Sequence, residues 1–567
     1  MDKRFFLALL LTGVVLIVTP LLFSPPPRAA TAGATASEVP EPNLGTTAPA
    51  SANPGVPTTA VRSVAPVGHE RTGGASESAR TRATRTALAT DVIDTIHASG
   101  AGAAFVFSTQ GASPKLAELP QYRSLGATSG AVILQSGADP LLQYSVLSGT
   151  DTVRLDRTIF RYSRDEVLGG TVLTFTSPDT ANPARVVYRL QSNAQITHVE
   201  IAVLKATDRA YLILGLPRGF LSHEADTLDD IRHLSYAAKP ITHGASGVAF
   251  SSLDPGEKKL IAGPISWAVA KSKYFVVGVL SLSDSTPFSE VHLTGGARDS
   301  KLATRGTATV VVPLVNGRAS FDLYAGPQSW ERMRALGRDF ETANPYGGFM
   351  QPAVQPFATI VMRLMLWLKR VVQLDYGWVL VIFGLAIRIV LWPLNQSAMR
   401  SSIRLQRVQP ELVAVQEKYK NDRTKQQEEI MKVYQAHNMS PFSALSGCLP
   451  ALIPMPVFFA LFFVFQNTIE FRGVPFLWLA DISLKDPFYI LPIVTGGSMF
   501  LLSWIGMRNM PKNPQATMML YLMPGMFTTF LLSTASGLSI YYLVQQIAAI
   551  PQQWMIANER KKAQAKG

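Results

Sequence analysis

The feature that most constrains this chain is an apolar stretch with one arginine inside it. Residues 376–395 read Tyr-Gly-Trp-Val-Leu-Val-Ile-Phe-Gly-Leu-Ala-Ile-Arg-Ile-Val-Leu-Trp-Pro-Leu-Asn, and the arginine is Arg388. A helix of this length and composition can span the ~30 Å hydrocarbon core of a bilayer. A guanidinium stays charged at any biological pH, and burying it at the centre of a bilayer costs at least ~2.5–3.5 kcal/mol. The chain must therefore supply water or polar partners for Arg388.

Two interpretations of Arg388 are open at this point. It precedes Asn395 by seven residues, which is ~10 Å along a helix, so its long side chain can extend to the lipid headgroups and have no other role. In the other interpretation, Arg388 lines a groove in which water solvates the guanidinium, and this groove receives polar parts of other polypeptides. The rest of the chain favours the groove.

Composition narrows the class of protein. Only 16% of the residues are charged, compared with ~25% in soluble domains, which indicates membrane spans. The formal net charge of +13 suits an anionic membrane leaflet or ribosomal RNA and selects neither. The single cysteine, Cys448, excludes an intrachain disulfide and any cysteine cluster for zinc or iron–sulfur binding. We expect no metal and no cofactor.

The amino-terminal region predicts an anchor and a linker. Lys3 and Arg4 precede an apolar run that ends at residue 23, so residues 1–23 are predicted to be a transmembrane anchor whose amino end is cytoplasmic. Small residues follow the run, and a cleaved signal peptide is the alternative. Residues 24–90 are rich in Pro, Ala and Thr and are predicted to be a disordered linker, because they cannot bury a core.

Residues 91–343 predict a β-sandwich domain. Alternating and β-branched runs recur at 172–176, 198–204, 274–280 and 308–314, and turn signals such as Asn316-Gly317 separate them, as in antiparallel sandwiches. A short helix is expected within 222–235. The acidic cluster there, with His223, Glu224, Asp226, Asp229 and Asp230, lacks the spacing of a known metal motif, and we interpret it as a solvated polar loop.

The remaining sequence predicts an all-α region. Residues 355–373 form an interfacial amphipathic helix, because cationic residues occupy one face of an otherwise apolar run. The span 376–395 ends near Pro393. Residues 396–447 then form a cytoplasmic helical hairpin, whose second helix starts at a capping box of Thr424 and Gln427.

Four further transmembrane helices are expected within residues 448–557, followed by a basic cytoplasmic tail, 558–567. With the anchor and the span 376–395, this gives six spans. The basic segments then all fall on one side of the membrane, in agreement with the positive-inside rule. Both termini and the hairpin are therefore expected in the cytoplasm, and the β domain in a periplasm-like space.

Several local motifs carry a resemblance to a known family. Arg388 is followed by Trp392-Pro393-Leu394 and Gln409-Pro410, and the later motifs are Gly447-Cys448-Leu449-Pro450, Asp486-Pro487-Phe488, Met523-Pro524 and Ser536-Gly537-Leu538 with Tyr541-Tyr542. Their order, together with an anchor, a large external β domain, an interfacial helix and five clustered spans, resembles the YidC-type membrane protein insertases (the YidC/Oxa/Alb family) of Gram-negative bacteria.

The resemblance implies a multi-domain membrane protein in which an all-α polytopic core is joined to an all-β periplasmic β-supersandwich. It implies a hydrophilic groove that is open to the cytoplasm and the lipid, with substrate-groove residues Arg388, Gly384, Met455, Phe458, Tyr541 and Tyr542. Gly384 and Pro454 depart from the family pattern, in which relatives carry polar side chains. We therefore expect water to hydrate more of this groove.

The implied function is a membrane protein insertase and chaperone that inserts and folds inner-membrane proteins, alone or with the Sec translocon. The implied partners are nascent inner-membrane proteins, the Sec translocon, the ribosome and anionic lipids, and the implied location is the bacterial inner membrane. No enzyme activity is expected, because the spans carry neither paired acids nor a metal cluster. A transporter for a small anionic solute is the alternative, although the inverted repeats typical of transporters are not evident.

Overall fold

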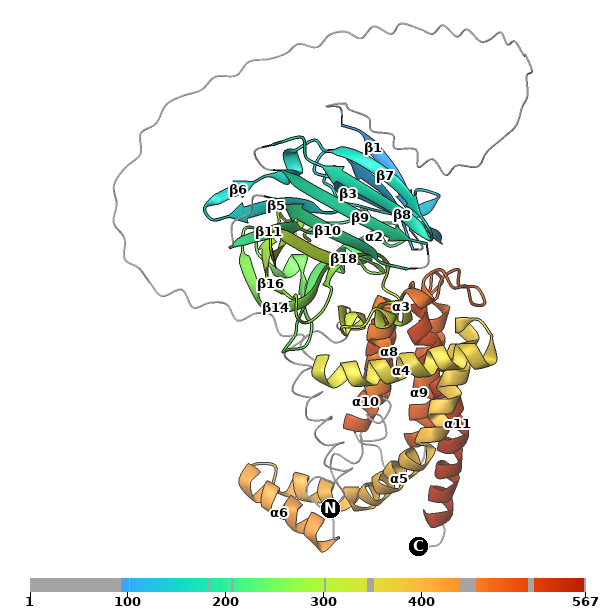
Figure 1. Cartoon of the computed structure of the whole chain (residues 1–567). Helices are drawn as coiled ribbons and strands as arrows, with labels where there is room; N and C mark the ends of the chain where they lie inside the picture. The colour runs from blue at the N-terminus through green and yellow to red at the C-terminus, as the bar shows by residue number, and fades with distance from the viewer. Residues whose placement is uncertain are drawn as a thin grey trace, which may run out of the picture. The chain divides into compact units, whose positions relative to one another are not determined.

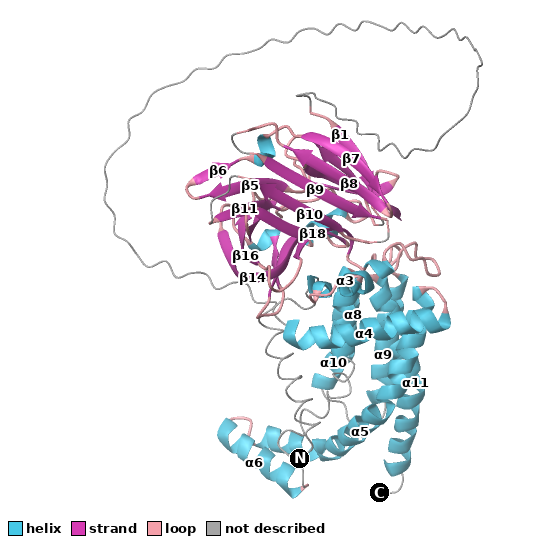
Figure 2. Cartoon of the chain, in the orientation of Figure 1, coloured by secondary structure: helices cyan, strands magenta, loops and turns pink. Residues whose placement is uncertain are grey.

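The computed structural model describes residues 93–100, 102–180, 183–192, 194–204, 209–299, 302–343, 351–437, 455–507 and 514–564. The predicted anchor and linker, 1–23 and 24–90, lie outside the described residues, as do 438–454 between the hairpin and the next span. Ala83–Gly567 forms one compact unit. Strands make up its first part and long helices its second (Figure 2).

The described residues up to 343, here called the β domain, contain two antiparallel sheets. The four strands of the small sheet are β1 (Thr95–Ser99), β2 (Ala104–Ser108), β3 (Ser113–Arg123) and β4 (Ala131–Gln135). The large sheet runs in the order β6 (Asp151–Val153), β5 (Gln143–Ser148), β11 (Ala210–Gly215), β17 (Gly306–Pro313), β16 (Phe288–Gly295), β14 (Lys258–Lys271), β15 (Phe275–Ser281), β18 (Arg318–Pro327), β10 (Thr197–Val203), β9 (Ala184–Gln191), β8 (Gly170–Thr176) and β7 (Arg161–Val167), with β12 (Ser235–Pro240) beside β14 and β13 (Ser246–Ala249) beside β12. Short helices in this domain are α2 (Thr227–Arg232), α3 (Trp330–Ala335), η1 (Leu155–Arg157), η2 (Phe250–Ser252) and η3 (Phe340–Ala343).

Side chains from both sheets form the core of the β domain. Phe107 on β2 lies 4.6 Å from Tyr188 on β9 and 6.1 Å from Phe175 on β8, measured between ring centroids. The Tyr188 hydroxyl donates to the Ala112 carbonyl at 2.7 Å, so its polar end is paired inside the core. The prediction of a large all-β domain is therefore confirmed.

Local sequence patterns explain the strands well. On β17 every second residue is buried, which is the two-residue period of a strand with one face on a core. The β17–β18 turn places Asn316 and Gly317 at φ 52° and 71°, the left-handed region that a two-residue hairpin turn requires. The predicted strands and this predicted turn are confirmed.

The helical part contains the long elements of the chain (Figure 1). They are α4 (Gln351–Val372), α5 (Tyr376–Lys418), α6 (Arg423–Ala436), α8 (Met455–Asn467), α9 (Ile490–Met507), α10 (Pro514–Leu531) and α11 (Ser536–Gln564), with η6 (Ile469–Phe471) after α8. Among the described residues, two helical stretches are long and apolar enough to cross a bilayer, Tyr376–Ser397 and Ile490–Met507. Met455–Phe465 and Leu520–Leu531 are shorter apolar helices. The count of six spans stays a prediction.

The apolar stretch of α5 ends at Ser397, close to the predicted end of the span, but the helix itself does not end there. Helix α5 continues through Pro393 and Pro410 to Lys418. A proline removes one helical hydrogen bond, but ending the helix inside an apolar environment would expose several unpaired backbone groups, which costs more. The first helix of the predicted hairpin is thus the continuation of the span.

The predicted pairing of the two hairpin helices is confirmed, because Val408 and Leu412 on α5 are buried with Tyr434 on α6. The predicted capping box at Thr424 is wrong. Helix α6 begins two residues earlier than a Thr424 cap requires, and the Asp422 side chain accepts a hydrogen bond from the Lys425 N–H at 3.0 Å. Aspartate is among the most favourable N-cap residues, and Asp422 rather than Thr424 is the N-cap of α6.

Candidate functional site

Arg388 faces helix α11, which packs against α5. Its Nη2 donates a hydrogen bond to Gln552 Oε1 at 2.7 Å, and Gln552 Nε2 in turn donates to Gln396 Oε1 at 3.2 Å. Its Nε is buried and lacks a hydrogen-bond partner within the described part of the chain, and no ion pair is recorded for Arg388 there. The guanidinium is therefore held by a neutral amide, and no described residue compensates its charge.

Gly384 lies one turn before Arg388 and lets α5 and α11 approach each other. A Cβ built on Gly384 would lie 3.0 Å from Val544 Cγ1 on α11, closer than ordinary van der Waals contact. The Gly384 carbonyl accepts a hydrogen bond from Gln545 Nε2 at 2.7 Å. Gly384 therefore contributes to the close packing of two helices and presents its backbone, rather than a side chain, to α11.

The aromatic site residues form an apolar cluster across α8, α10 and α11. Tyr542 lies 5.6 Å from Phe458 and 4.4 Å from Phe527, between ring centroids. Met455 is half-buried against the larger apolar core that includes Phe458. Tyr541 is fully buried, packs 5.9 Å from Phe383 on α5, and its hydroxyl has no partner among the described residues.

The structure thus groups the six predicted site residues in two places. Arg388 and Gly384 contact α11 at its glutamines and at Val544. Phe458 and Tyr542 belong to the aromatic cluster, and Tyr541 contacts α5 next to Gly384. The sequence analysis expected water or polar partners around the guanidinium, but it did not identify the glutamines that join α11 to α5. The signal was present, because Gln545 and Gln552 are seven residues apart and interrupt the apolar part of this helix.

A second polar site joins the β domain to residues 469–489, here called loop 469–489. Arg472 Nε lies 2.9 Å from both carboxylate oxygens of Glu224, and its terminal nitrogens donate to the Arg123 and His223 carbonyls. The guanidinium also lies 5.3 Å from the ring centroid of Phe275. The two charged side chains are only 5% and 7% exposed. Burial raises the pKa of the Glu224 carboxyl, and the charge of Arg472 opposes that shift.

Glu470 lies in the same loop, and its buried carboxylate has few hydrogen-bond donors. Its Oε1 accepts a hydrogen bond from the Ser329 hydroxyl at 3.0 Å. Its Oε2 is buried and lacks a partner within the described residues. Burial raises the pKa of the Glu470 carboxyl, because the charged form loses water and gains only one side-chain donor.

The interpretation of the acidic cluster at 223–230 as a solvated loop is wrong. Glu224 and Asp230 are 5% and 3% exposed. The Asp229 carboxylate pairs with Lys273 Nζ at 2.7 Å, and Asp230 Oδ1 accepts the Lys273 N–H at 3.0 Å. The cluster therefore fastens α2 to the strands and to loop 469–489. Its partners are distant in sequence, so the local pattern did not reveal them.

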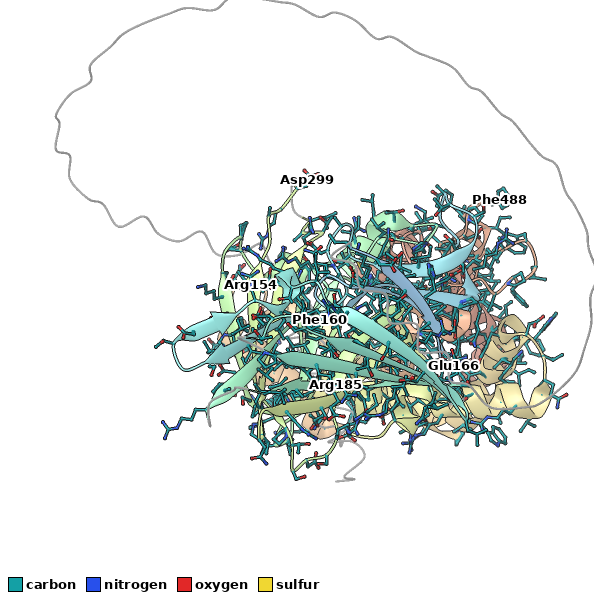
Figure 3. All side chains as sticks on the ribbon, turned by 45° about the horizontal axis from the view of Figure 1, so that its top comes forward. Arg154, Phe160, Glu166, Arg185, Asp299 and Phe488 are labelled. Carbon is teal, nitrogen blue, oxygen red and sulfur yellow. The ribbon has the colours of Figure 1, made fainter. Side chains whose placement is uncertain are left out.

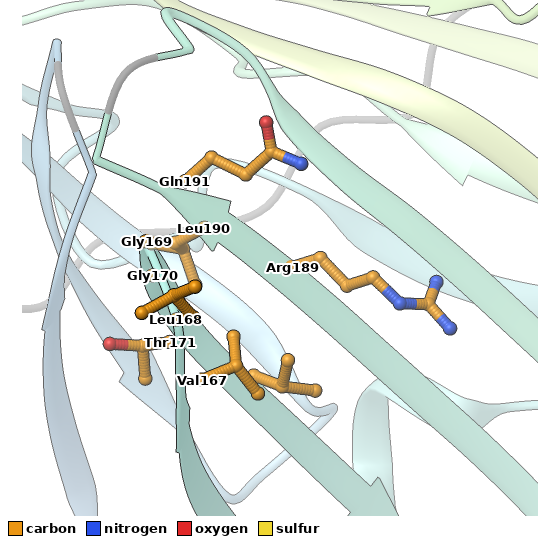
Figure 4. Close-up of a pocket in the computed structure, with 9 residues that line it drawn as sticks. Val167, Leu168, Gly169, Gly170, Thr171, Arg189, Leu190 and Gln191 are labelled. Atoms are coloured by element: carbon orange, nitrogen blue, oxygen red, sulfur yellow. The ribbon is translucent and has the colours of Figure 1, made fainter.

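The β domain also carries a hollow of about 280 Å³ at the β7–β8 turn (Figure 4). It is lined by Val167, Leu168, Gly169, Gly170, Thr171, Val172, Arg189, Leu190 and Gln191. Arg189, the charged residue of this lining, pairs with Glu200 at 3.2 Å. The hollow therefore does not bring polar groups together as a specific ligand site would.

Comparisons with known proteins bear on both parts of the chain. The profile of a family described as "60Kd inner membrane protein" matches residues 367–564, and one described as "YidC periplasmic domain" matches residues 103–360. A protein of Anaeromyxobacter dehalogenans named membrane protein insertase YidC is 33% identical over 324 residues, which are 57% of each chain. A protein of the same name from a Geobacter species is 29% identical over 468 residues, 80% of this chain and 83% of the relative. The chain thus spans just over half the length of the first of these relatives.

Solved structures give likenesses of low sequence identity. A crystal structure titled "Active YidC insertase crystal structure with the first transmembrane domain resolved" is 19% identical, with a TM-score of 0.33 over 83% of this chain and 95% of that one. The crystal structure of YidC from Thermotoga maritima is 14% identical, with a TM-score of 0.28 over 82% and 99%.

Proposed function

This chain belongs to the YidC-type family of inner-membrane proteins, and on that premise we propose that it is a membrane protein insertase and chaperone. Its clients are nascent inner-membrane proteins, which it inserts and folds alone or with the Sec translocon. The relatives named above are called insertases and not transporters, so anion transport is not proposed.

One observation carries the proposal: Arg388 contacts a neutral amide on α11 and keeps an unpaired charge at membrane depth. A client must move a polar segment across hydrocarbon, and each polar group that loses water there costs free energy. A hydrated groove beside Arg388 shortens the dry part of that path. In a setting of low dielectric constant the charge also attracts acidic client residues more strongly than it would in water.

The aromatic cluster supplies the apolar counterpart of this groove. Met455, Phe458 and Tyr542 contact the client's hydrophobic segment as it leaves towards the lipid, and Tyr541 and Gly384 form the wall between α5 and α11. Partition of the client's apolar helix into lipid provides the driving force, and no nucleotide is required.

The proposed topology has six spans, with the anchor 1–23, both termini and the α5–α6 hairpin on the cytoplasmic side and the β domain in the periplasm. The distribution of Lys and Arg in the sequence supports it. The exposed apolar side chains of Leu477, Trp478, Phe488 and Tyr489 in loop 469–489 suit the opposite membrane–water interface; Phe488 is labelled in Figure 3. The hairpin and the basic tail 558–567 bind the ribosome and anionic lipids.

The proposal is tested in a strain depleted of its own insertase, with Arg388→Ala, Arg388→Lys and the unchanged chain. Reporters carry one span and an external tail that is either acidic or neutral. Arg388→Ala is expected to lower insertion of the acidic-tailed reporter roughly tenfold, since hydrogen bonds to charged groups contribute ~1.5–3 kcal/mol. Arg388→Lys keeps the charge and is expected to retain part of the activity. Normal insertion of the acidic reporter by Arg388→Ala would refute the groove.

A further inference from the structure

Two buried glutamines lie on the face of α11 that packs against α5. Gln545 and Gln552 are seven residues apart, about two helical turns, so their side chains share a face. They are 6% and 1% exposed. Gln545 donates to the Gly384 carbonyl, whereas Gln552 accepts from Arg388. The two residues share chemistry, burial and helix pair, but Gln552 alone of the two contacts the charge.

The Gln552 amide is held at both of its ends. A carboxamide presents one acceptor oxygen and two N–H donors in a single plane. The oxygen of Gln552 accepts from Arg388 Nη2, and its nitrogen donates to Gln396, which lies two turns beyond Arg388 on α5. An amide fixed in this way directs the guanidinium. Because the amide is neutral, it does so without cancelling the charge, which a carboxylate at the same position would do.

The guanidinium keeps hydrogen-bonding capacity that the fold does not use. Its Nε is buried and unpartnered in the described part of the chain, and a buried donor without an acceptor is a rare feature that calls for a water or a ligand. Arginine offers carboxylates two parallel N–H donors, and this geometry favours them over other acceptors. A hydrogen bond made through one N–H of Nη2 therefore leaves the Nε N–H, and with it a further donor on Nη1 or Nη2, available to an acidic side chain.

We infer that Gln552 is a positioning residue that orients Arg388 and preserves its charge, and thereby sets the preference of the groove for clients with acidic external segments. The inference rests on the proposed insertase function and deepens it. Gln552 acts through Arg388 and does not itself contact the client. In the competing explanation, Gln552 only joins two helices, as Gln545 does.

The first experiment measures insertion by the purified full-length chain in proteoliposomes. The variants are Gln552→Glu, Gln552→Leu and the matched control Gln545→Leu, and the reporters differ only in whether the external tail carries two Asp residues or two Asn residues. Gln552→Glu places a carboxylate on Arg388 and is expected to lower acidic-tail insertion roughly tenfold, while neutral-tail insertion changes by less than about twofold. Gln545→Leu is expected to affect both tails equally.

Equal losses on both tails for Gln552→Glu, or no loss on either, would overturn the inference. The neutral reporter also serves as the folding control, because a misfolded variant inserts neither tail. If the unchanged chain inserted neither reporter, the proposed function would fail, and the role of Gln552 would then be decided by a readout that does not depend on insertion.

That second readout is the chemical reactivity of Arg388. The full-length chain in detergent is treated with phenylglyoxal, which modifies arginine, and the peptide containing Arg388 is quantified by mass spectrometry. Gln552→Leu frees Nη2 and is expected to raise the modification rate of Arg388 roughly tenfold, whereas Gln545→Leu leaves it unchanged. An equal rate in Gln552→Leu and the unchanged chain would refute the positioning role.

Discussion

The buried ion pair of Arg472 and Glu224 joins loop 469–489 to the β domain, and its strength can be measured. Both side chains are almost fully buried, so removing one of them leaves the other charge without water and without its partner. Breaking a buried pair in this way costs ~3–5 kcal/mol. Arg472→Met is therefore expected to destabilise the attachment of the loop by about that amount. Adding Glu224→Gln should recover part of the lost stability, because the double variant leaves no unpaired charge in the interior.

The chain contains a matched control for this prediction. Arg370 on α4 and Glu331 on α3 also join the helical part to the β domain, with 2.6 Å between Nη2 and Oε1. Their side chains are 72% and 50% exposed, and such surface pairs contribute ~0–1 kcal/mol. The two pairs have the same chemistry and differ in burial, so burial alone predicts a severalfold difference in coupling energy.

Hydrogen exchange of the full-length chain in detergent, followed by mass spectrometry, gives the opening free energy of amides in loop 469–489 for the first pair and in α3 and α4 for the second. Two double-mutant cycles are compared, one with Arg472→Met and Glu224→Gln and the other with Arg370→Met and Glu331→Gln. We expect a coupling energy of at least ~2 kcal/mol for the first cycle and below ~1 kcal/mol for the second. Equal coupling energies in the two cycles would refute the argument from burial.

Two further predictions concern the same loop and the proposed groove. Burial raises the pKa of Glu470 above its ordinary value of 4.5, so the stability that this group contributes is present below that value and is lost as the pH rises through the raised pKa. Thermal unfolding measured between pH 4 and 9 should therefore show Glu470→Gln to be more stable than the unchanged chain at the alkaline end, and identical pH profiles would contradict the assignment. A photocrosslinker at Met455 or Tyr542 should form adducts with nascent membrane proteins during translation, whereas the same probe at the exposed Arg164 should not; adducts of equal yield at all three positions would argue against a groove.

The sequence predicted those parts of the fold that depend on neighbouring residues. The two-residue alternation of β17 and the Asn316-Gly317 turn encode strand and hairpin directly. Competition between local signals was harder to resolve. Asp422 and Thr424 both fit a helix start, and Pro393 resembles a helix end, although the apolar surroundings keep α5 continuous.

The candidate site was predicted in its charge but not in its partners. Arg388 is conspicuous because it interrupts an apolar run, whereas Gln552 lies 164 residues away along the chain. In the same way, Glu224 and Arg472 are separated by 248 residues. Contacts over such distances depend on how helices and strands pack, and neither periodicity nor composition records them. The seven-residue spacing of Gln545 and Gln552 indicates a polar helix face, but it does not identify the helix that the face meets.

Loop 469–489 contacts both the β domain and the first turn of α11. Ile469 is buried in the core of the β domain, and the carbonyls of Ile482 and Leu484 accept hydrogen bonds from the Gly537 and Ser536 N–H groups. Cutting the chain between the strands and the helices would therefore break contacts on both sides of the cut and would not give two independent parts. A shortened protein without the β domain would expose Ile469 to solvent and leave Arg472 without its carboxylate partner, in the same loop that contacts the start of α11. Anyone who trims this protein to its helices should replace Ile469 with a polar residue, whereas Arg472 is soluble without its partner.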